Sequence, residues 1–230
     1  MRPYTISHMM MSVDGRIDCA MTEQIDPTNS YYDALRRLDC PSMLMGRVTM
    51  QMHYASPGAF AAADATPVGH TALHKAADGN EGYVIGTDTH GRLCWPSAVA
   101  DGRPLLVVVS EACPQAYVDA LTAQGISWLA TGADTIDWPR AMETLRTEFG
   151  VERLAVTGGG HINGALLAAD LLDEVSVMIG PGIDGRRGMT AVFDGIDDPS
   201  RPATLLSLRS VERVNEGTVW LRYTTAGRKG

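Results

Sequence analysis

Short apolar runs alternate with helical patterns along most of this chain, and this alternation limits the possible folds more than any other feature. The runs that we expect to form strands cover residues 4–11, 42–45, 83–86, 105–110, 126–130, 154–157 and 174–179. Helical patterns lie between them at residues 27–38, 114–124, 138–149 and 164–170. Strands that alternate with helices are typical of an α/β protein with a largely parallel sheet.

Two kinds of residue mark the ends of the predicted helices. Asp26 can cap the helix over residues 27–38, with Pro27 at its first position. Gly125 and Gly150 follow the next two helices, and glycine often ends a helix.

The last third of the chain has a different pattern. Residues 204–214 and 218–223 flank Asn215-Glu216-Gly217, which predicts an antiparallel hairpin with a glycine in its loop. We therefore expect a mixed, mainly parallel sheet flanked by helices, with a C-terminal antiparallel hairpin at one edge. Residues 1–225 are expected to form a single domain and residues 226–230 a disordered tail. Residues 55–82 predict a long irregular connection, of a kind that is usually functional or mobile.

Charge and cysteine usage exclude several classes of function. The net charge of −8 argues against a general polyanion binder, because such a protein needs a basic face. Four scattered cysteines without a C-x-x-C pair indicate free thiols in a reducing cytosol, so we expect a cytoplasmic protein. The apolar run at the start is too short to span a membrane. His70 and His74 have no H-E-x-x-H around them, so we expect surface histidines and no metal site.

The first candidate binding segment is Met-Gly-Arg-Val-Thr at residues 45–49, directly after a predicted strand. Open α/β sheets bind ligands at the carboxyl ends of their strands, and a helix that starts there offers backbone N–H groups to an anion. Arg47 can bind a phosphate through two hydrogen bonds, and the Thr49 hydroxyl can donate another. The alternative is an ordinary junction between strand and helix with a solvated arginine.

The second candidate segment is Thr-Gly-Gly-Gly-His-Ile-Asn-Gly at residues 157–164, again between a strand and a helix. Three consecutive glycines remove every side chain from the turn, so a pyrophosphate could lie against the backbone at the helix N-terminus. The string is neither the G-x-G-x-x-G fingerprint nor a P-loop. The alternative is that the glycines serve only tight packing of the strand and helix.

The third segment, residues 12–17, follows the first strand and contains Asp14-Gly15. A carboxylate at the end of a strand can orient a substrate or relay a proton. The alternative is an ordinary turn, since Asp-Gly is a common turn dipeptide.

Taken together, these segments resemble one family. Residues 4–17, 35–50 and 153–185 are similar to the reductase domain of bacterial riboflavin biosynthesis, which reduces a phosphoribosylamino-pyrimidine with NADPH. The strongest stretch, GGGHINGALLAADLLDEVSVMIGPGIDG at residues 158–185, matches in its glycines, its L-x-D-E and its G-P-x-x-D-G. That domain is a relative of dihydrofolate reductase, which the M-G-R-x-T string also resembles. The resemblance implies a dihydrofolate reductase-like fold.

The resemblance also implies which residues bind the cofactor, NADPH. Gly46, Arg47 and Thr49 would contact it, with Arg47 facing the 2′-phosphate. Met10, at the end of the first strand, would lie near the nicotinamide through its backbone. The turn that would wrap the pyrophosphate consists of Gly158, Gly159, Gly160, His161, Ile162, Asn163 and Gly164.

The same resemblance implies residues around the substrate. Asp14 would border the site as its catalytic carboxylate, and Arg37 would contact the substrate phosphate. For Arg37 the alternative is a solvated helix charge, because Arg36 and Arg37 are adjacent and only one can face inward. Thr157 occupies a substrate-binding position where the family usually carries a glutamate. A neutral hydroxyl cannot replace a carboxylate that accepts two hydrogen bonds from the pyrimidine.

Two hypotheses of different classes follow. The first is an NADPH-dependent reductase of a phosphoribosylamino-pyrimidine, with dihydrofolate or a pterin as the second choice of substrate. No deaminase signature precedes the first strand, so we expect reduction alone. The second is a non-catalytic nucleotide-binding module of the same fold. This hypothesis stays open because Thr157 stands where the family usually carries a glutamate.

The resemblance further implies a homodimer. Residues 218–223 place Val219, Leu221 and Tyr223 on one face and Trp220 on the other. Apolar bulk on both faces suggests that neither faces bulk water, which would fit a subunit interface. The alternative is that Trp220 packs under a helix of its own chain.

Overall fold

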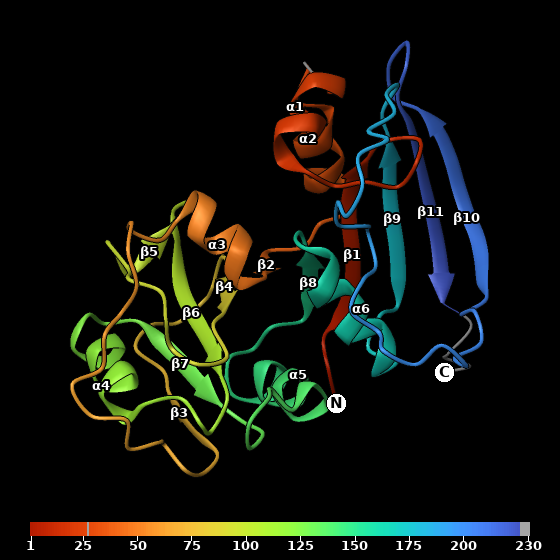
Figure 1. Ribbon diagram of the computed structural model, residues 1–230. Helices are drawn as coiled ribbons and strands as arrows, with labels where there is room; N and C mark the ends of the chain where they lie inside the picture. Colours follow the sequence, from red (N-terminus) through yellow and green to blue (C-terminus); the bar gives the residue numbers. More distant parts are fainter. Residues whose placement is uncertain (27, 226–230) are drawn as a thin grey trace. The chain divides into compact units, whose positions relative to one another are not determined.

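The computed structural model describes residues 1–26 and 28–225, within which the chain forms two compact units (Figure 1). The first unit contains residues 1–3 and 41–154, and the second contains residues 4–40 and the chain from 155 onward. A single domain over residues 1–225 stays a prediction. The expected tail at 226–230 and the expected helix position of Pro27 lie outside the described residues.

The first unit is built on parallel strands. Their spatial order is β2 (Ser42–Met45), β4 (Val84–Thr87), β6 (Arg103–Val109) and β7 (Ser127–Ala130), followed by the antiparallel β3 (Ala72–His74). The short β5 (Val99–Ala100) pairs with β6, and the helices are α3 (Arg47–His53), α4 (Gln115–Ala123) and α5 (Trp138–Thr147). Every residue of β2, β4 and β7 is buried, as expected of parallel strands covered on both faces.

The second unit combines parallel and antiparallel strands. Their spatial order is β10 (Leu206–Arg213), β11 (Val219–Thr225), β9 (Glu174–Ile179) and β1 (Tyr4–Met11). β1 is parallel to β9, whereas β11 is antiparallel to both β9 and β10, so the predicted C-terminal hairpin is confirmed. The helices are α1 (Cys19–Ile25), α2 (Ser30–Arg37) and α6 (Gly160–Ala168), and β8 (Arg153–Val156) crosses the boundary between the units along the chain.

The predicted strands are confirmed to within two residues at each end, whereas two helix boundaries were wrong. The helix expected over 27–38 begins at Ser30, and its N-cap is Asn29 rather than Asp26. Asp26 still stabilises this helix, because its carboxylate accepts hydrogen bonds from the backbone N–H groups of Ser30 (3.0 Å) and Tyr31 (2.9 Å). The helix expected from residue 164 begins at Gly160, inside the glycine string.

Two apolar clusters cover opposite faces of the strands in the second unit. One contains Met10 and Trp220, and the other contains Met9 and Val192. Successive residues of a strand point to opposite faces, which is why Met9 and Met10 belong to different clusters. Trp220 packs with Ala34 and Leu38, at α2 and its C-cap, so the interpretation that it lies under a helix of its own chain is confirmed.

A fully buried histidine joins α2 to this Trp220 face. His8 stacks on the Tyr31 ring, with ring centroids 4.6 Å apart, and its Nε2 lies 3.3 Å from the Tyr31 carbonyl, which can only accept. Its Nδ1 lies 2.9 Å from Ser176 Oγ, which accepts the Trp220 indole N–H at 2.7 Å. The network therefore assigns the neutral Nε2–H form to His8, with Ser176 donating to Nδ1.

Acidification should destabilise the protein through His8. Burial lowers the pKa of His8 from 6.5 to about 4, so the unfolded chain binds a proton that the folded chain rejects between those values. The free energy of unfolding should therefore fall as the pH drops from 6.5 to 4, by about 3 kcal/mol through this group. Urea titrations across this range should show a shallower pH dependence for His8→Gln; identical slopes would contradict the assignment.

Candidate functional site

The glycine turn follows β8 and leads directly into α6. Gly159 is the N-cap of α6, with φ −101° and ψ −177°, and the Gly158–Gly159 peptide bond is cis. The backbone of Gly159 is thus extended, a conformation that any residue can adopt. The first N–H groups of α6 have no partner within the helix, which makes this turn a candidate anion site.

Two other glycines of the string serve close packing. A Cβ on Gly160 would lie 2.2 Å from the Ala191 carbonyl oxygen, and one on Gly164 would lie 2.0 Å from the Asp194 carbonyl oxygen. Both distances are far below van der Waals contact. Gly160 and Gly164 therefore serve close packing, but against the backbone of residues 190–194 and not between the strand and the helix as the packing alternative had it.

The side chains within the string differ in their surroundings. Asn163 is fully buried: its amide oxygen accepts from Ser7 Oγ at 3.1 Å, and its amide nitrogen donates to the Val192 carbonyl at 2.8 Å. His161 is exposed and Ile162 is half-buried. After the three glycines, His161 and Ile162 are the residues of the string with side-chain surface that a ligand could contact.

Thr157 carries an unsatisfied polar atom immediately before the glycines. Its hydroxyl oxygen is buried and has no hydrogen-bond partner among the described residues. Buried polar groups nearly always have a partner, so such an atom is typical of one that bonds a ligand or water. The glycine turn fits the phosphate region of a nucleotide cofactor, and the Thr157 hydroxyl next to it is available to a bound substrate.

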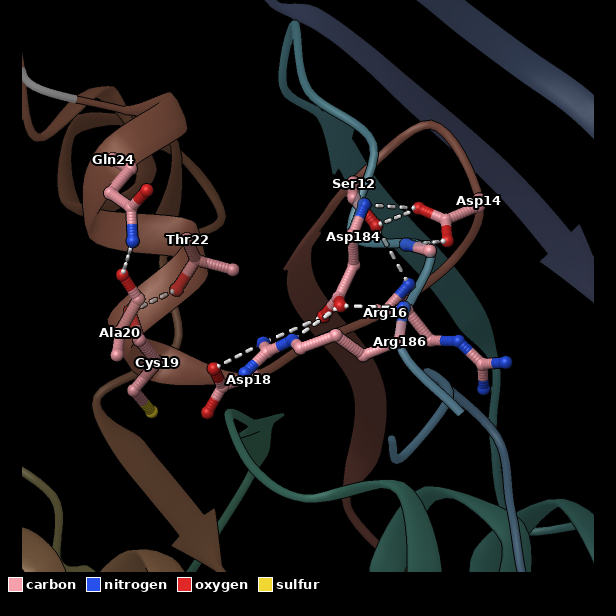
Figure 2. A network of polar contacts seen from close by, with 11 residues as sticks. Ser12, Asp14, Arg16, Asp18, Cys19, Ala20, Thr22, Gln24, Asp184 and Arg186 are labelled. Carbon is pink, nitrogen blue, oxygen red and sulfur yellow. Dashed lines mark hydrogen bonds and ion pairs between the residues drawn. The ribbon is translucent and has the colours of Figure 1, made fainter. Parts of the chain in front are cut away.

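Asp14 is held by the loop that follows β9 (Figure 2). Its carboxylate accepts from Ser12 Oγ (2.6 Å) and from the backbone N–H groups of Asp184 and Gly185 (both 2.9 Å). The Ser12 hydroxyl and then these N–H groups hold the pKa of Asp14 well below its usual range. Asp14 is therefore ionised near neutral pH, which makes it a poor proton donor and a good anchor for the loop.

Arginine contacts fasten the same loop. Arg186 donates to Asp184 and, at 2.7 Å, to Asp18, which precedes α1 (Figure 2). Arg16 Nη1 donates to the Met189 carbonyl at 2.5 Å. The loop is thus tied both to the residues after β1 and to the start of α1.

Arg37 has partners other than a ligand. Its guanidinium forms two hydrogen bonds with the Glu212 carboxylate (2.8 and 2.6 Å) and lies 4.6 Å from the centre of the Trp220 ring. Trp220 belongs to the cluster with Met10, whereas Val192 belongs to the cluster on the opposite face of the strands. Arg37 therefore lies on the face away from Asn163 and residues 190–194.

The remaining candidate residues are Met10, Gly46, Arg47 and Thr49. Met10 pairs with Met178 in the β1–β9 ladder, and its side chain is buried in the apolar cluster, so only its backbone could meet a ligand. Gly46 is the N-cap of α3 in the first unit, where Arg47 is exposed and Thr49 half-buried. Among the described residues, the Arg47 guanidinium has no hydrogen-bond or ion-pair partner.

The candidate site residues predicted from the sequence are divided between the two units. The first holds Gly46, Arg47 and Thr49, and the second holds the other residues. Sequence reasoning missed Ser7 and Val192, which hold Asn163 in place. A serine inside an apolar strand was a usable signal, whereas a backbone carbonyl leaves none. Residues 1–26 and 28–225 contain neither a helix able to cross a bilayer nor a metal-binding group of three acidic, histidine or cysteine side chains.

Comparison with known proteins gives one family, and the curated relatives include two reductases of the same name. The family described as the RibD C-terminal domain matches residues 3–220. The 2,5-diamino-6-ribosylamino-4(3H)-pyrimidinone 5′-phosphate reductase of Methanothermobacter thermautotrophicus is 28% identical over 243 residues, covering 99% of this chain and 100% of that protein. The reductase of the same name from Archaeoglobus fulgidus is 29% identical over 118 residues, or 51% of each protein.

Solved structures agree on the fold. A pyrimidine reductase-like protein from Corynebacterium diphtheriae has a TM-score of 0.72 at 13% identity, covering 98% of this chain and 93% of that one. The riboflavin biosynthesis reductase of Saccharomyces cerevisiae has a TM-score of 0.60 at 19% identity, with coverage of 98% and 90%. The predicted fold class is confirmed.

Proposed function

Because this chain belongs to the RibD C-terminal domain family, we propose that it is a reductase of 2,5-diamino-6-ribosylamino-4(3H)-pyrimidinone 5′-phosphate or a close analogue. The observation that carries the proposal is the match over residues 3–220, since it includes both the glycine turn and the Gly46–Thr49 segment. Membership of this reductase family implies a nicotinamide cofactor, and we propose that the cofactor is NADPH.

Three parts of the chain would hold the cofactor. The N–H groups at the start of α6 would bind the pyrophosphate, and the Arg47 guanidinium would bind the 2′-phosphate. The backbone of Met10 would border the nicotinamide. The cofactor supplies the hydride, so the protein's part is to align it with the substrate and to exclude water.

Two further side chains have roles in the proposal. Asp14 would fix the loop after β9, because its carboxylate is occupied by the N–H groups of Asp184 and Gly185. The Thr157 hydroxyl would bond the substrate, since its oxygen has no partner among the described residues. Arg37 is left out of the substrate site, because Glu212 neutralises it on the opposite face of the strands.

Turnover tests the proposal directly. Purified protein should oxidise NADPH when the ribosylamino-pyrimidinone phosphate is added, as measured by loss of NADPH absorbance. Dihydrofolate and a dihydropterin serve as comparison substrates, because Thr157 departs from the glutamate of the family. NADPH binding without turnover of any of the three would instead support a nucleotide-binding module.

Arg47 should set the choice between NADPH and NADH. A charged hydrogen bond to the 2′-phosphate predicts roughly ten- to hundredfold tighter binding of NADPH. Dissociation constants from cofactor fluorescence should differ by this factor in the wild type and converge in Arg47→Ala. Arg140→Ala, another exposed arginine of the first unit, should keep the difference. Equal constants in the wild type would reject the assignment.

We also propose a cytoplasmic homodimer. On β10, Leu208 and Val211 are 58% and 59% exposed and lie opposite Tyr223 and Leu221 of β11, so they share one face. β10 is the last strand in the spatial order, and exposed apolar side chains on an edge strand favour association.

Light scattering at micromolar concentration should give a mass of twice 24.7 kDa. Leu208→Glu should shift it to the monomer, because the carboxylate would be buried without a partner in the interface. Glu216→Gln, in the hairpin loop, is the control. A monomeric wild type would end the dimer proposal.

A further inference from the structure

Residues 182–194, which we call the strap, lie against both the loop after β1 and helix α6. At one end, Val13 N–H donates to the Gly182 carbonyl at 2.8 Å, and Asp14 accepts two strap N–H groups. At the other end, Asp194 N–H donates to the Gly160 carbonyl at 3.1 Å. The strap therefore reaches the glycine turn itself.

The Asn163 side chain joins the strap to the sheet through the interior. It accepts from Ser7 of β1 and donates to the Val192 carbonyl of the strap. An amide is needed here, because one group must both accept and donate. Asn163 is 0% exposed, so its side chain leaves no surface for direct contact with a cofactor.

The backbone of Asn163 belongs to the first turn of α6. Its N–H donates to the Gly159 carbonyl at 3.2 Å. Fixing the Asn163 side chain therefore fixes the direction in which the N–H groups after Gly159 point. Anion binding at a helix N-terminus depends on that direction.

We infer that Asn163 is a positioning residue, which clamps the strap onto α6 and so holds the glycine turn in the shape that binds the cofactor pyrophosphate. This inference rests on the proposed function. It assigns the effect of Asn163 to the strap, and not to a contact with the ligand.

Two substitutions separate the bonds of Asn163. In its ionised form, which is favoured by measurement at pH 8, Asn163→Asp can still accept from Ser7 but cannot donate to the Val192 carbonyl. Ser7→Ala removes the other bond and leaves the strap bond in place, so it is the matched control. If Asn163→Asp does not fold, as judged by circular dichroism, Gly164→Ala displaces the strap by another route, since its Cβ would lie 2.0 Å from the Asp194 carbonyl oxygen.

Two measurements report on the clamp. Trypsin cleavage after Arg186 and Arg187 reports on the strap without any need for activity. Dissociation constants are measured for NADPH and for adenosine 2′-monophosphate, which has the 2′-phosphate but no phosphate at the 5′ position. In Asn163→Asp we expect cleavage to be faster and NADPH binding to be weaker, each by about tenfold. Adenosine 2′-monophosphate affinity should stay unchanged, and Ser7→Ala, which keeps the strap bond, should lie closer to the wild type than Asn163→Asp in both assays.

Unchanged NADPH binding in a folded Asn163→Asp variant would overturn the inference. Equal weakening of both ligands would also overturn it, because a clamp on the pyrophosphate turn affects NADPH alone. A wild type that binds no NADPH would overturn the proposed function and the cofactor part of the inference together. The trypsin result would then still decide whether Asn163 holds the strap.

Discussion

Replacing Gly159 with valine is expected to weaken NADPH binding by at least about a hundredfold, or roughly 3 kcal/mol. Gly159 is the N-cap of α6, where the proposed pyrophosphate site has backbone and no side chain. A valine side chain would occupy the space of the pyrophosphate at this position. Cofactor fluorescence titration measures the loss, and circular dichroism establishes that the variant is folded.

The control belongs to the same helix. Ala168 is exposed in the last turn of α6, so Ala168→Val adds the same side chain away from the glycine turn. Its NADPH affinity should equal that of the wild type. Wild-type affinity in a folded Gly159→Val protein would remove the glycine turn from the cofactor site, whatever the enzyme reduces.

The sequence predicted the strands well because buried parallel strands are nearly continuous apolar runs. Ser42–Met45 and Glu174–Ile179 were predicted with their observed bounds. Helix starts were harder to predict. Glycine normally disfavours a helix, yet α6 begins at Gly160, because any side chain at this position would collide with residues 190–194. Only the folded chain shows that contact.

The candidate site was predictable in its location and less so in the role of each side chain. The resemblance selected residues such as Asn163 and Arg37 by position. Their partners, Val192 and Glu212, are distant in sequence, so no local pattern could assign one to the strap and the other to an ion pair. Two adjacent arginines predicted only that no more than one of them can face inward, and in the structure both are exposed.

Removal of the buried Glu174 carboxylate should lower the free energy of unfolding more than any other substitution proposed for this protein. Glu174 is 0% exposed; it accepts from Arg209 at 2.6 Å and forms a second ion pair with Arg222. It also accepts from the Tyr4 hydroxyl at 3.4 Å. The L-x-D-E string that supported the resemblance therefore includes a residue that holds β1, β9, β10 and β11 together.

Glu174→Ala leaves the Arg222 guanidinium, whose side chain is 18% exposed, without its counter-charge. Breaking a buried ion pair from one side costs about 3–5 kcal/mol, which for a chain of this size lowers the Tm by roughly 6–20 °C. The control is Glu152→Ala, because the carboxylate of Glu152 pairs with Arg146 while 73% exposed, and such pairs contribute at most about 1 kcal/mol. Thermal melting of both variants tests this prediction. If the Tm falls by the same small amount in both, the Arg209–Glu174–Arg222 contacts contribute no more than a surface ion pair.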